Sequence, residues 1–197
     1  VPPISTHGIT FGSFYTAVQP NCTVAGINVV AQIESLYWPY TGGACAYEIT
    51  THGVGYVNFT ERTIPFYDKF VAKWGSTLGS PLYCSIGAGD AINLYAAAFE
   101  NAGTFVNDDI VAELEKFNES NTFPGISAEN LAFDQYHDVL ETQVPGREGF
   151  FSIVYRQYHA DGSLPIIPSG GLYDWNSLYP RAQTSHMIYP PWWPAAP

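Results

Sequence analysis

TERTIPFYDKFVAKWG (residues 60–75) and SIGAGDAINLYAAAFENAG (residues 85–103) both repeat apolar residues at the spacing of an amphipathic helix. Thr60 can cap the first helix and Gly75 ends it, while Gly103 can form the left-handed cap of a second helix over about 86–102. The expected buried faces are Ile64, Tyr67, Phe70, Val71 and Trp74 in the first helix and Ile92, Tyr95, Ala96 and Phe99 in the second.

Segments on both sides of this pair alternate between strand and helix patterns. A third helix is expected after Asn107, with a buried face of Ile110, Val111, Leu114 and Phe117. Strands are expected at 24–30, 48–57, 150–159 and 164–168, and ITFGSFYTAV (9–18) fits a further strand, whereas Pro39 and Gly42-Gly43 predict irregular structure. The alternation predicts an α/β fold with mainly parallel sheets flanked by helices.

Composition narrows the function classes. Seven basic and 18 acidic residues give a formal charge of −11, which argues against a nucleic-acid partner, and no polybasic run could hold an anionic membrane. No apolar run approaches the ~20 residues of a membrane span, and the chain starts at VPPISTHG without a signal peptide, so an exported form would be a processed product. Few charges and many aromatic residues favour an extracellular face or a protein assembly.

Three cysteines and three glycosylation sequons bear on the compartment. Cys22 and Cys45 are the preferred disulfide pair, with three buried thiols including Cys84 as the alternative. The sequons begin at Asn21, Asn58 and Asn118, each beside a predicted turn or element end, and favour a glycosylated surface protein.

Patterns that would indicate catalysis or a cofactor are weak. Gly87-Ala88-Gly89 lacks the third glycine of a dinucleotide fingerprint, and the cluster of Asp134, His137 and Asp138 is more typical of a solvated loop than of a metal site. No GxSxG motif or catalytic cysteine signature occurs, and Glu113 and Glu115 fit an exposed helix face. The sequence therefore predicts no catalytic residue, no metal and no cofactor.

The aromatic segment Tyr37-Trp38-Pro39-Tyr40 has two interpretations. It can pack at the edge of the core, or it can form the apolar wall of a pocket at the carboxyl end of the 24–30 strand, where ligands of open α/β sheets bind.

A resemblance to a known family emerges from eight segments in order. These are GINVVAQIES (26–35), TGGACAYE (41–48) after Trp38, TIPFYDKFVAKWG (63–75), GAGDAINLYAAAFENAGT (87–104), NDDIVAELEK (107–116), LAFDQYHDV (131–139), YRQYHADG (155–162) and YPPWW (189–193). Together they resemble the last half of the Leu/Ile/Val-type ABC-transporter solute-binding proteins, which have the type I periplasmic-binding-protein fold, and in particular archaeal members. The resemblance covers residues 24–193 almost continuously.

The resemblance implies a domain organisation. Family members have two α/β lobes joined by a hinge and close on an amino acid or similar small polar solute for a membrane permease. On this basis residues 1–47 form a second-lobe segment with the ligand-side loop, and residues 48–135 a first-lobe segment after the hinge crossover. Residues 136–180 form the hinge return with second-lobe strands, and residues 181–197 a Pro/Trp-rich C-terminal strap.

Two departures from the family change the expectation. The first half of the family is absent, so a complementary N-terminal fragment or a second chain is expected to cover the exposed apolar faces and strand edges. The acidic group that holds a ligand ammonium aligns with the neutral Asn28.

The function expected from these observations is non-enzymatic: an extracytoplasmic solute-binding protein for ABC import. Asn28 and Gln32 would offer hydrogen bonds, and Tyr37 and Trp38 apolar contact. The alternative is a structural subunit of an extracellular surface assembly or filament built on the same fold, favoured by the aromatic residues, the sequons, the tail and the neutral Asn28.

Overall fold

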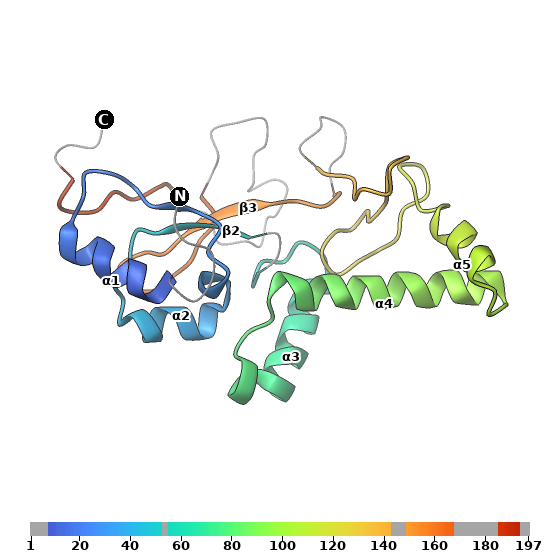
Figure 1. Cartoon of the computed structure of the whole chain (residues 1–197), viewed down its shortest axis with the longest axis horizontal. Coiled ribbons are helices and arrows are strands. Elements are labelled where there is room, and N and C mark those ends of the chain that lie inside the picture. Colours follow the sequence, from blue (N-terminus) through green and yellow to red (C-terminus); the bar gives the residue numbers. More distant parts are fainter. Residues whose placement is uncertain (1–7, 53–54, 143–148, 168–184, 194–197) are drawn as a thin grey trace.

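The chain folds around a small three-stranded sheet (Figure 1). The computed structural model describes residues 8–52, 55–142, 149–167 and 185–193. Strand β2 (Ile49–His52) is central: it runs parallel to β1 (Ala25–Gly26) and antiparallel to β3 (Val154–Gln157). The α/β fold class predicted from the sequence is confirmed, and within the described residues the sheet is mixed, since four of its six residue pairs join β2 to β3.

The N-terminal segment is a helix, so the strand expected at 9–18 is wrong. Helix α1 spans Gly8–Val18. Gly12 and Tyr15, three residues apart, are buried, and a Cβ at Gly12 would lie 3.5 Å from the carbonyl oxygen of Ala44. The apolar residues of ITFGSFYTAV fit helical spacing as well as alternation, and close packing on residues 44–45 decides between them.

The aromatic segment that was expected to be irregular is also a helix. After a 3-10 turn, η1 (Val30–Gln32), helix α2 spans Glu34–Thr41 with Pro39 inside it. Pro39 lacks an N–H group, so one helical hydrogen bond is missing, but the helix ends two residues later. Gly42 follows with φ 58° and donates its N–H to the carbonyl of Pro39 over 3.1 Å.

The three central helices are confirmed with shifted ends. They are α3 (Thr63–Leu78), α4 (Tyr83–Ala102) and α5 (Asn107–Leu114). The Thr60 hydroxyl accepts the N–H of Arg62 over 3.0 Å in the turn that precedes α3, and Gly79 rather than Gly75 follows its last residue. Gly103 has φ 63°, which is the left-handed cap expected from the sequence.

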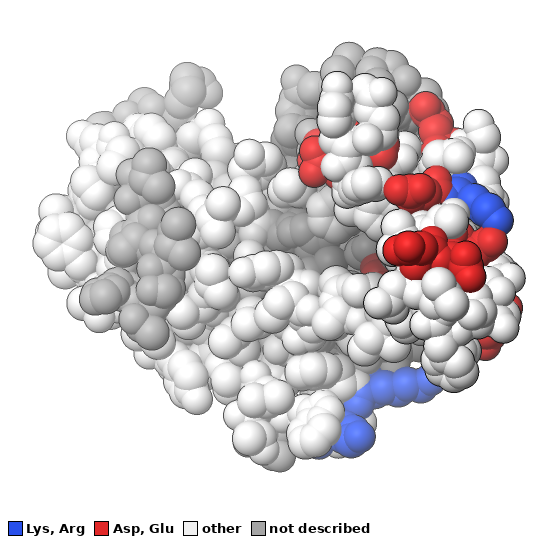
Figure 2. Space-filling model, turned by 45° about the vertical axis from the view of Figure 1, so that its right-hand side comes forward, with Lys and Arg blue, Asp and Glu red and all other residues white. Residues whose placement is uncertain are grey.

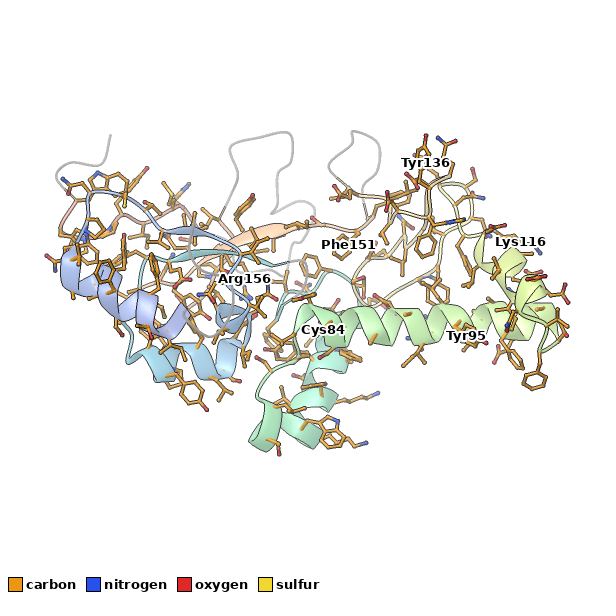
Figure 3. The ribbon with its side chains drawn as sticks, viewed as in Figure 1. Cys84, Tyr95, Lys116, Tyr136, Phe151 and Arg156 are labelled. Atoms are coloured by element: carbon orange, nitrogen blue, oxygen red, sulfur yellow. The ribbon has the colours of Figure 1, made fainter. Side chains whose placement is uncertain are left out.

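The buried faces of α3 and α4 differ from the expected ones. In α4 the buried residues are Ile86, Asp90, Leu94 and Ala98, whereas Ile92 and Tyr95 are 69% and 52% exposed. In Figure 3 Tyr95 lies on the opposite side of α4 from the loops that contain Phe151. Tyr67 of α3 is buried, but Trp74 is 45% exposed. The apolar stripe that the sequence suggests for α4 therefore faces outward.

The core consists of separate clusters within the described residues. One lies beneath the sheet and includes Tyr37, Cys45 and Tyr158. Another joins α4 to the loops after α5 through Leu94 and Leu131. Domains with a complete core usually have one contiguous cluster. The division of the core into separate clusters is consistent with the exposed apolar side chains of α3 and α4.

Asp90 fixes the loop that covers the start of α4. Its carboxylate, buried in the helix, accepts the N–H of Ile126 over 2.5 Å and both the N–H and the hydroxyl of Ser127 over 2.9 and 2.6 Å. The carboxylate thereby satisfies two backbone donors that have no helix or sheet partner.

We expect Asp90→Ala to lower the free energy of unfolding by about 2–4 kcal/mol, because it leaves buried donors unsatisfied. Urea denaturation followed by circular dichroism measures the loss. Asn93→Ala, on the exposed side of the same helix, is the matched control and should change stability by less than about 0.5 kcal/mol. Equal effects of the two substitutions would contradict the role of Asp90.

Candidate functional site

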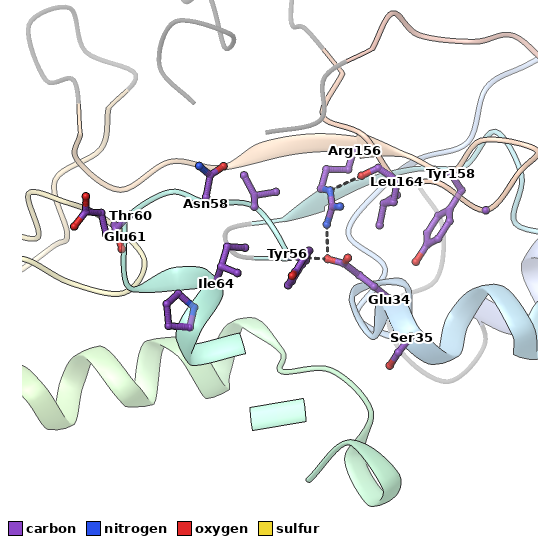
Figure 4. A pocket seen from close by; sticks show the side chains of 13 residues that line it. Glu34, Ser35, Tyr56, Asn58, Thr60, Glu61, Ile64, Arg156, Tyr158 and Leu164 are labelled. Carbon is purple, nitrogen blue, oxygen red and sulfur yellow. Dashed lines mark hydrogen bonds and ion pairs between the residues drawn. The ribbon is translucent and has the colours of Figure 1, made fainter. Parts of the chain in front are cut away.

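A cavity of about 830 Å³ lies between α2, the end of β3 and the start of α3 (Figure 4). Glu34 and Ser35 line it from α2, and Arg156 and Tyr158 line it from β3 and the residue after it. The remaining wall comes from the segment before α3, from the first turn of α3 and from the loop after β3: Tyr56, Val57, Asn58, Thr60, Glu61, Ile64, Pro65, Gly162 and Leu164. Its volume lies within the range of small-molecule sites.

An ion pair between the buried Arg156 and the partly buried Glu34 forms one end of the cavity. Arg156 is 6% exposed, and its terminal nitrogen Nη1 donates to Oε1 of Glu34 while its Nε donates to the carbonyl of Leu164 over 2.8 Å. The N–H of Tyr56 donates to the same Glu34 oxygen over 3.1 Å. Glu34 thus connects β3 and the segment before α3 to the first turn of α2.

Each member of the pair keeps unused hydrogen-bonding capacity. Among the described residues, no partner bonds Oε2 of Glu34 or Nη2 of Arg156, and neither atom is a buried orphan. An arginine side chain has five donors, and a carboxylate has about four acceptor positions. Solvent or a ligand in the cavity can therefore bond to both groups.

The rest of the wall is mainly apolar. Val57, Ile64, Pro65 and Leu164 contribute aliphatic surface. The hydroxyl of Tyr158 donates to the carbonyl of Ala31 over 2.7 Å, and burial, followed by the nearby charge of Glu34, raises the pKa of this phenol. Tyr158 therefore stays neutral and contributes its ring to the site.

Two of the residues proposed from the sequence as ligand contacts lie in the core behind this wall. Asn28 is 1% exposed, and its side-chain amide donates to the hydroxyl of Tyr37 over 2.9 Å and to Oε1 of Glu48 over 2.7 Å. The Tyr37 hydroxyl donates to Oε2 of Glu48 over 2.7 Å. Neither residue lines the cavity, because Glu48 takes up their donors.

Gln32 and Trp38, the other two residues proposed as ligand contacts, lie beside the cavity wall without lining it. Gln32 donates through Nε2 to the carbonyl of Thr51 over 3.2 Å. The Trp38 ring stacks on Tyr158, with centroids 6.2 Å apart, and would meet a Cβ at Gly162 at 3.0 Å. Trp38 therefore supports a residue of the wall from behind, and the structure assigns cavity contacts to Glu34 and Arg156 instead.

Glu48 is a buried carboxyl that sequence reasoning did not single out. It is 2% exposed, and burial raises its pKa above the ordinary value of 4.5, although the hydrogen bonds from Tyr37 and Asn28 oppose this rise. No sequence motif marks it, because its partners lie 11 and 20 residues away.

The raised pKa of Glu48 makes stability depend on pH. A carboxyl with a higher pKa in the folded state stabilises the fold below pH 4.5, and this stability is lost as the pH rises through the raised pKa. We expect Glu48→Gln to remove this loss of stability, so the free energy of unfolding of the variant should rise relative to that of the wild type as the pH increases.

Urea denaturation at about pH 4, 6 and 8 measures the free energy of unfolding of both proteins. Glu100→Gln changes an exposed carboxyl and is the control, so its unfolding free energy should vary with pH as in the wild type. If the unfolding free energy of Glu48→Gln also varies with pH as in the wild type, Glu48 is not the source of the pH dependence.

The disulfide expected between Cys22 and Cys45 is not formed. All three cysteines are free: Cys45 is buried, while Cys22 and Cys84 are exposed, so the alternative of three buried thiols holds for Cys45 alone. Thr41 donates its hydroxyl to Sγ of Cys45 over 3.1 Å, and burial raises the pKa of this thiol to about 11. Cys45 therefore acts as a small apolar core residue.

The three sequons differ in accessibility. Asn21 and Asn118 are exposed, and the side-chain oxygen of Asn118 accepts the N–H of Ser120 over 2.9 Å. Asn58 is partly buried in the cavity wall, and the hydroxyl of Thr60 in the same sequon is buried against the carbonyls of residues 125–126. A glycan on Asn58 would enter the cavity.

The weaker motifs have structural explanations. Gly87 and Gly89 lie inside α4 and not in a turn before a helix. Asp134 accepts the N–H groups of Tyr136 and Asp138 through one carboxylate oxygen, so it closes a turn. No group of three or more potential metal ligands occurs among the residues with described positions.

None of the described helices has the length and apolar character needed to cross a membrane.

Comparisons with known proteins give one structural similarity. No protein-family model and no curated protein sequence match the chain. The structure is similar to the crystal structure of a leucine binding protein from Thermotoga maritima, with a TM-score of 0.48 and 16% sequence identity. The similar region covers 81% of this chain and 47% of that protein, so the chain spans about half the length of its structural neighbour.

Proposed function

We propose that this chain is part of an extracytoplasmic solute-binding protein that holds a small polar solute in the cavity beside Glu34 and Arg156. One observation carries the proposal: a cavity of about 830 Å³ contains a partly buried ion pair whose remaining donors and acceptor are not used by the described residues. Both groups line the cavity, so a polar solute inside it can bond to them. Delivery to a membrane permease for ABC import is part of the same proposal.

The arrangement supports binding better than catalysis. Glu34 is held in place by Arg156 and by the Tyr56 N–H, and no described residue is placed to exchange a proton with it. Aliphatic groups and tyrosine rings form most of the remaining wall, as in sites where a few polar groups orient a ligand.

Calorimetric titration with a panel of amino acids, amides and short peptides tests the proposal. Ile64→Trp, which adds volume to the cavity wall, should weaken binding at least about tenfold. Ile92→Trp makes the same change on the exposed side of α4 and should leave affinity unchanged. A panel in which no solute binds would exclude solute binding.

A second polypeptide completes the fold in this proposal. Exposed apolar side chains lie on α3, at Val71, Trp74 and Leu78, and on one side of α4, at Ile92 and Tyr95; these five residues are called the α3/α4 face. Figure 2 shows that the charged side chains gather at the right and lower parts of the visible surface and leave much of the rest without charge. Exposed apolar side chains that gather on one surface are typical of interaction sites. The partner is a complementary N-terminal fragment or a separate chain, and the lobe division at residues 47, 135 and 180 belongs to this proposal.

The chain without a partner should bind the apolar dye 1-anilinonaphthalene-8-sulfonate through the α3/α4 face. Replacing Trp74 and Ile92 together by Ser should reduce dye fluorescence by at least about half, because both side chains are exposed. The unfolding free energy should fall by less than about 1 kcal/mol, since neither side chain is in the core. Unchanged fluorescence in the double variant would show that this face is not the apolar surface in solution.

In the same proposal the chain lies outside the cytoplasm, where its sequons can carry glycans. Modification at Asn21 and Asn118 is compatible with an open cavity, whereas modification at Asn58 is not. Intact mass spectrometry of the native material shows whether glycans are attached, and mass spectrometry after protease digestion assigns them to individual sequons.

The second candidate is a structural subunit of a surface assembly or filament, and the α3/α4 face is the observation that favours it. Electron microscopy of native cell surfaces discriminates, since an ordered layer or filament would support the structural subunit and isolated particles would exclude it.

A further inference from the structure

We infer that the cavity selects a small uncharged amide or urea-type group, which inserts its N–H and C=O edge between Glu34 and Arg156. The inference rests on the proposed solute-binding function and goes further, because it names the head group and the two atoms that recognise it. The carbonyl would accept from Nη2 of Arg156, and the amide N–H would donate to Oε2 of Glu34.

The ion pair has one formed contact and one open one. Arginine and carboxylate commonly pair through two parallel hydrogen bonds. Here Nη1 of Arg156 donates to Oε1 of Glu34, and this oxygen also accepts the N–H of Tyr56. The second donor and acceptor, Nη2 and Oε2, have no partner among the described residues, although Arg156 is more than nine-tenths buried.

The open contact matches a group with a donor and an acceptor in one plane. The guanidinium and the carboxylate are both planar, and a primary amide presents its N–H and C=O side by side in one plane. An α-amino acid presents an ammonium and a carboxylate instead, so it brings two charged groups into the cavity.

Charge also favours a neutral group. Glu34 and Arg156 neutralise each other, and Glu61 adds a negative charge to the same wall. A carboxylate ligand would face both acidic side chains, and a charged ligand must also lose its hydration in a largely apolar cavity. A neutral amide satisfies the open donor and acceptor without either cost.

The aliphatic wall sets the size of the attached group. In Figure 4 Ile64 lies across the cavity from the ion pair, and Val57 and Pro65 line the same cavity, so a short branched alkyl group on the amide carbon would contact aliphatic side chains. Isobutyramide combines the two features, and isobutyrate has nearly the same shape with a negative charge.

Calorimetric titration of the full chain with isobutyramide, isobutyrate, urea and valine tests the inference. We expect isobutyramide to bind at least about tenfold more tightly than isobutyrate and valine, because only the amide offers a donor and an acceptor without bringing a charge into the cavity. Tighter binding of valine or isobutyrate overturns the inference and leaves solute binding in place. If none of the four probes binds but another member of the amino-acid and peptide panel does, the inference alone fails; if nothing binds, both fail.

A matched pair of variants tests the assigned atoms. Glu34→Gln replaces the acceptor Oε2 by a donor of the same shape, so isobutyramide affinity should fall at least about tenfold. Glu100→Gln removes one negative charge from the exposed face of α4 and should leave the affinity unchanged. Thermal melting shows whether Glu34→Gln folds, and the isobutyramide and isobutyrate comparison on the wild type stands if it does not. Full amide affinity in folded Glu34→Gln would overturn the assignment.

Discussion

The pairing of Arg156 with Glu34 is the interaction on which the arrangement of this chain depends. It connects β3 to α2 across 122 residues of sequence, and the N–H of Tyr56 joins the segment before α3 to the same carboxylate oxygen. A buried ion pair adds little net stability, because the loss of hydration offsets the attraction. Loss of one member, however, leaves the other as an uncompensated buried charge, so the two elements can separate only at a high cost. The pair lies at one end of the cavity and links two of its walls.

Local sequence signals identified the elements better than their orientation. Helices α3, α4 and α5 and the Gly103 cap follow from residue spacing and backbone preference, which are properties of a single segment. Which face of α4 is buried depends instead on the loops that contain Ile126 and Leu131, and these cover the side with Leu94 rather than the side with Ile92. The N-terminal helix α1 was missed for a similar reason, since its pattern fits two periodicities and contact with residues 44–45 selects one.

The candidate site was located only approximately from the sequence. Asn28, Tyr37 and Trp38 lie behind the cavity wall. Asn28 and Tyr37 are hydrogen-bonded in a cluster with Glu48, and Trp38 stacks on Tyr158. A sequence pattern can propose a strand end as a binding region, yet it cannot show that a buried carboxyl from the next strand will take up the polar groups there. Glu34 and Arg156 have no motif that relates them, so their pairing could be recognised only in three dimensions.

The exposed α3/α4 face and the cavity share helix α3. Ile64 and Pro65 in its first turn line the cavity, while Trp74 and Leu78 near its end are exposed. The first turn is held within this chain, because the buried Thr63 donates its hydroxyl to the carbonyl of Ile126 over 2.6 Å. The far end has no such contact from its exposed apolar side chains, and a helix of this length is marginal in water unless another element packs against it. A partner that covers the far end would therefore stabilise the end of α3 that lies away from the cavity, while contacts within the chain already fix the end that lines it.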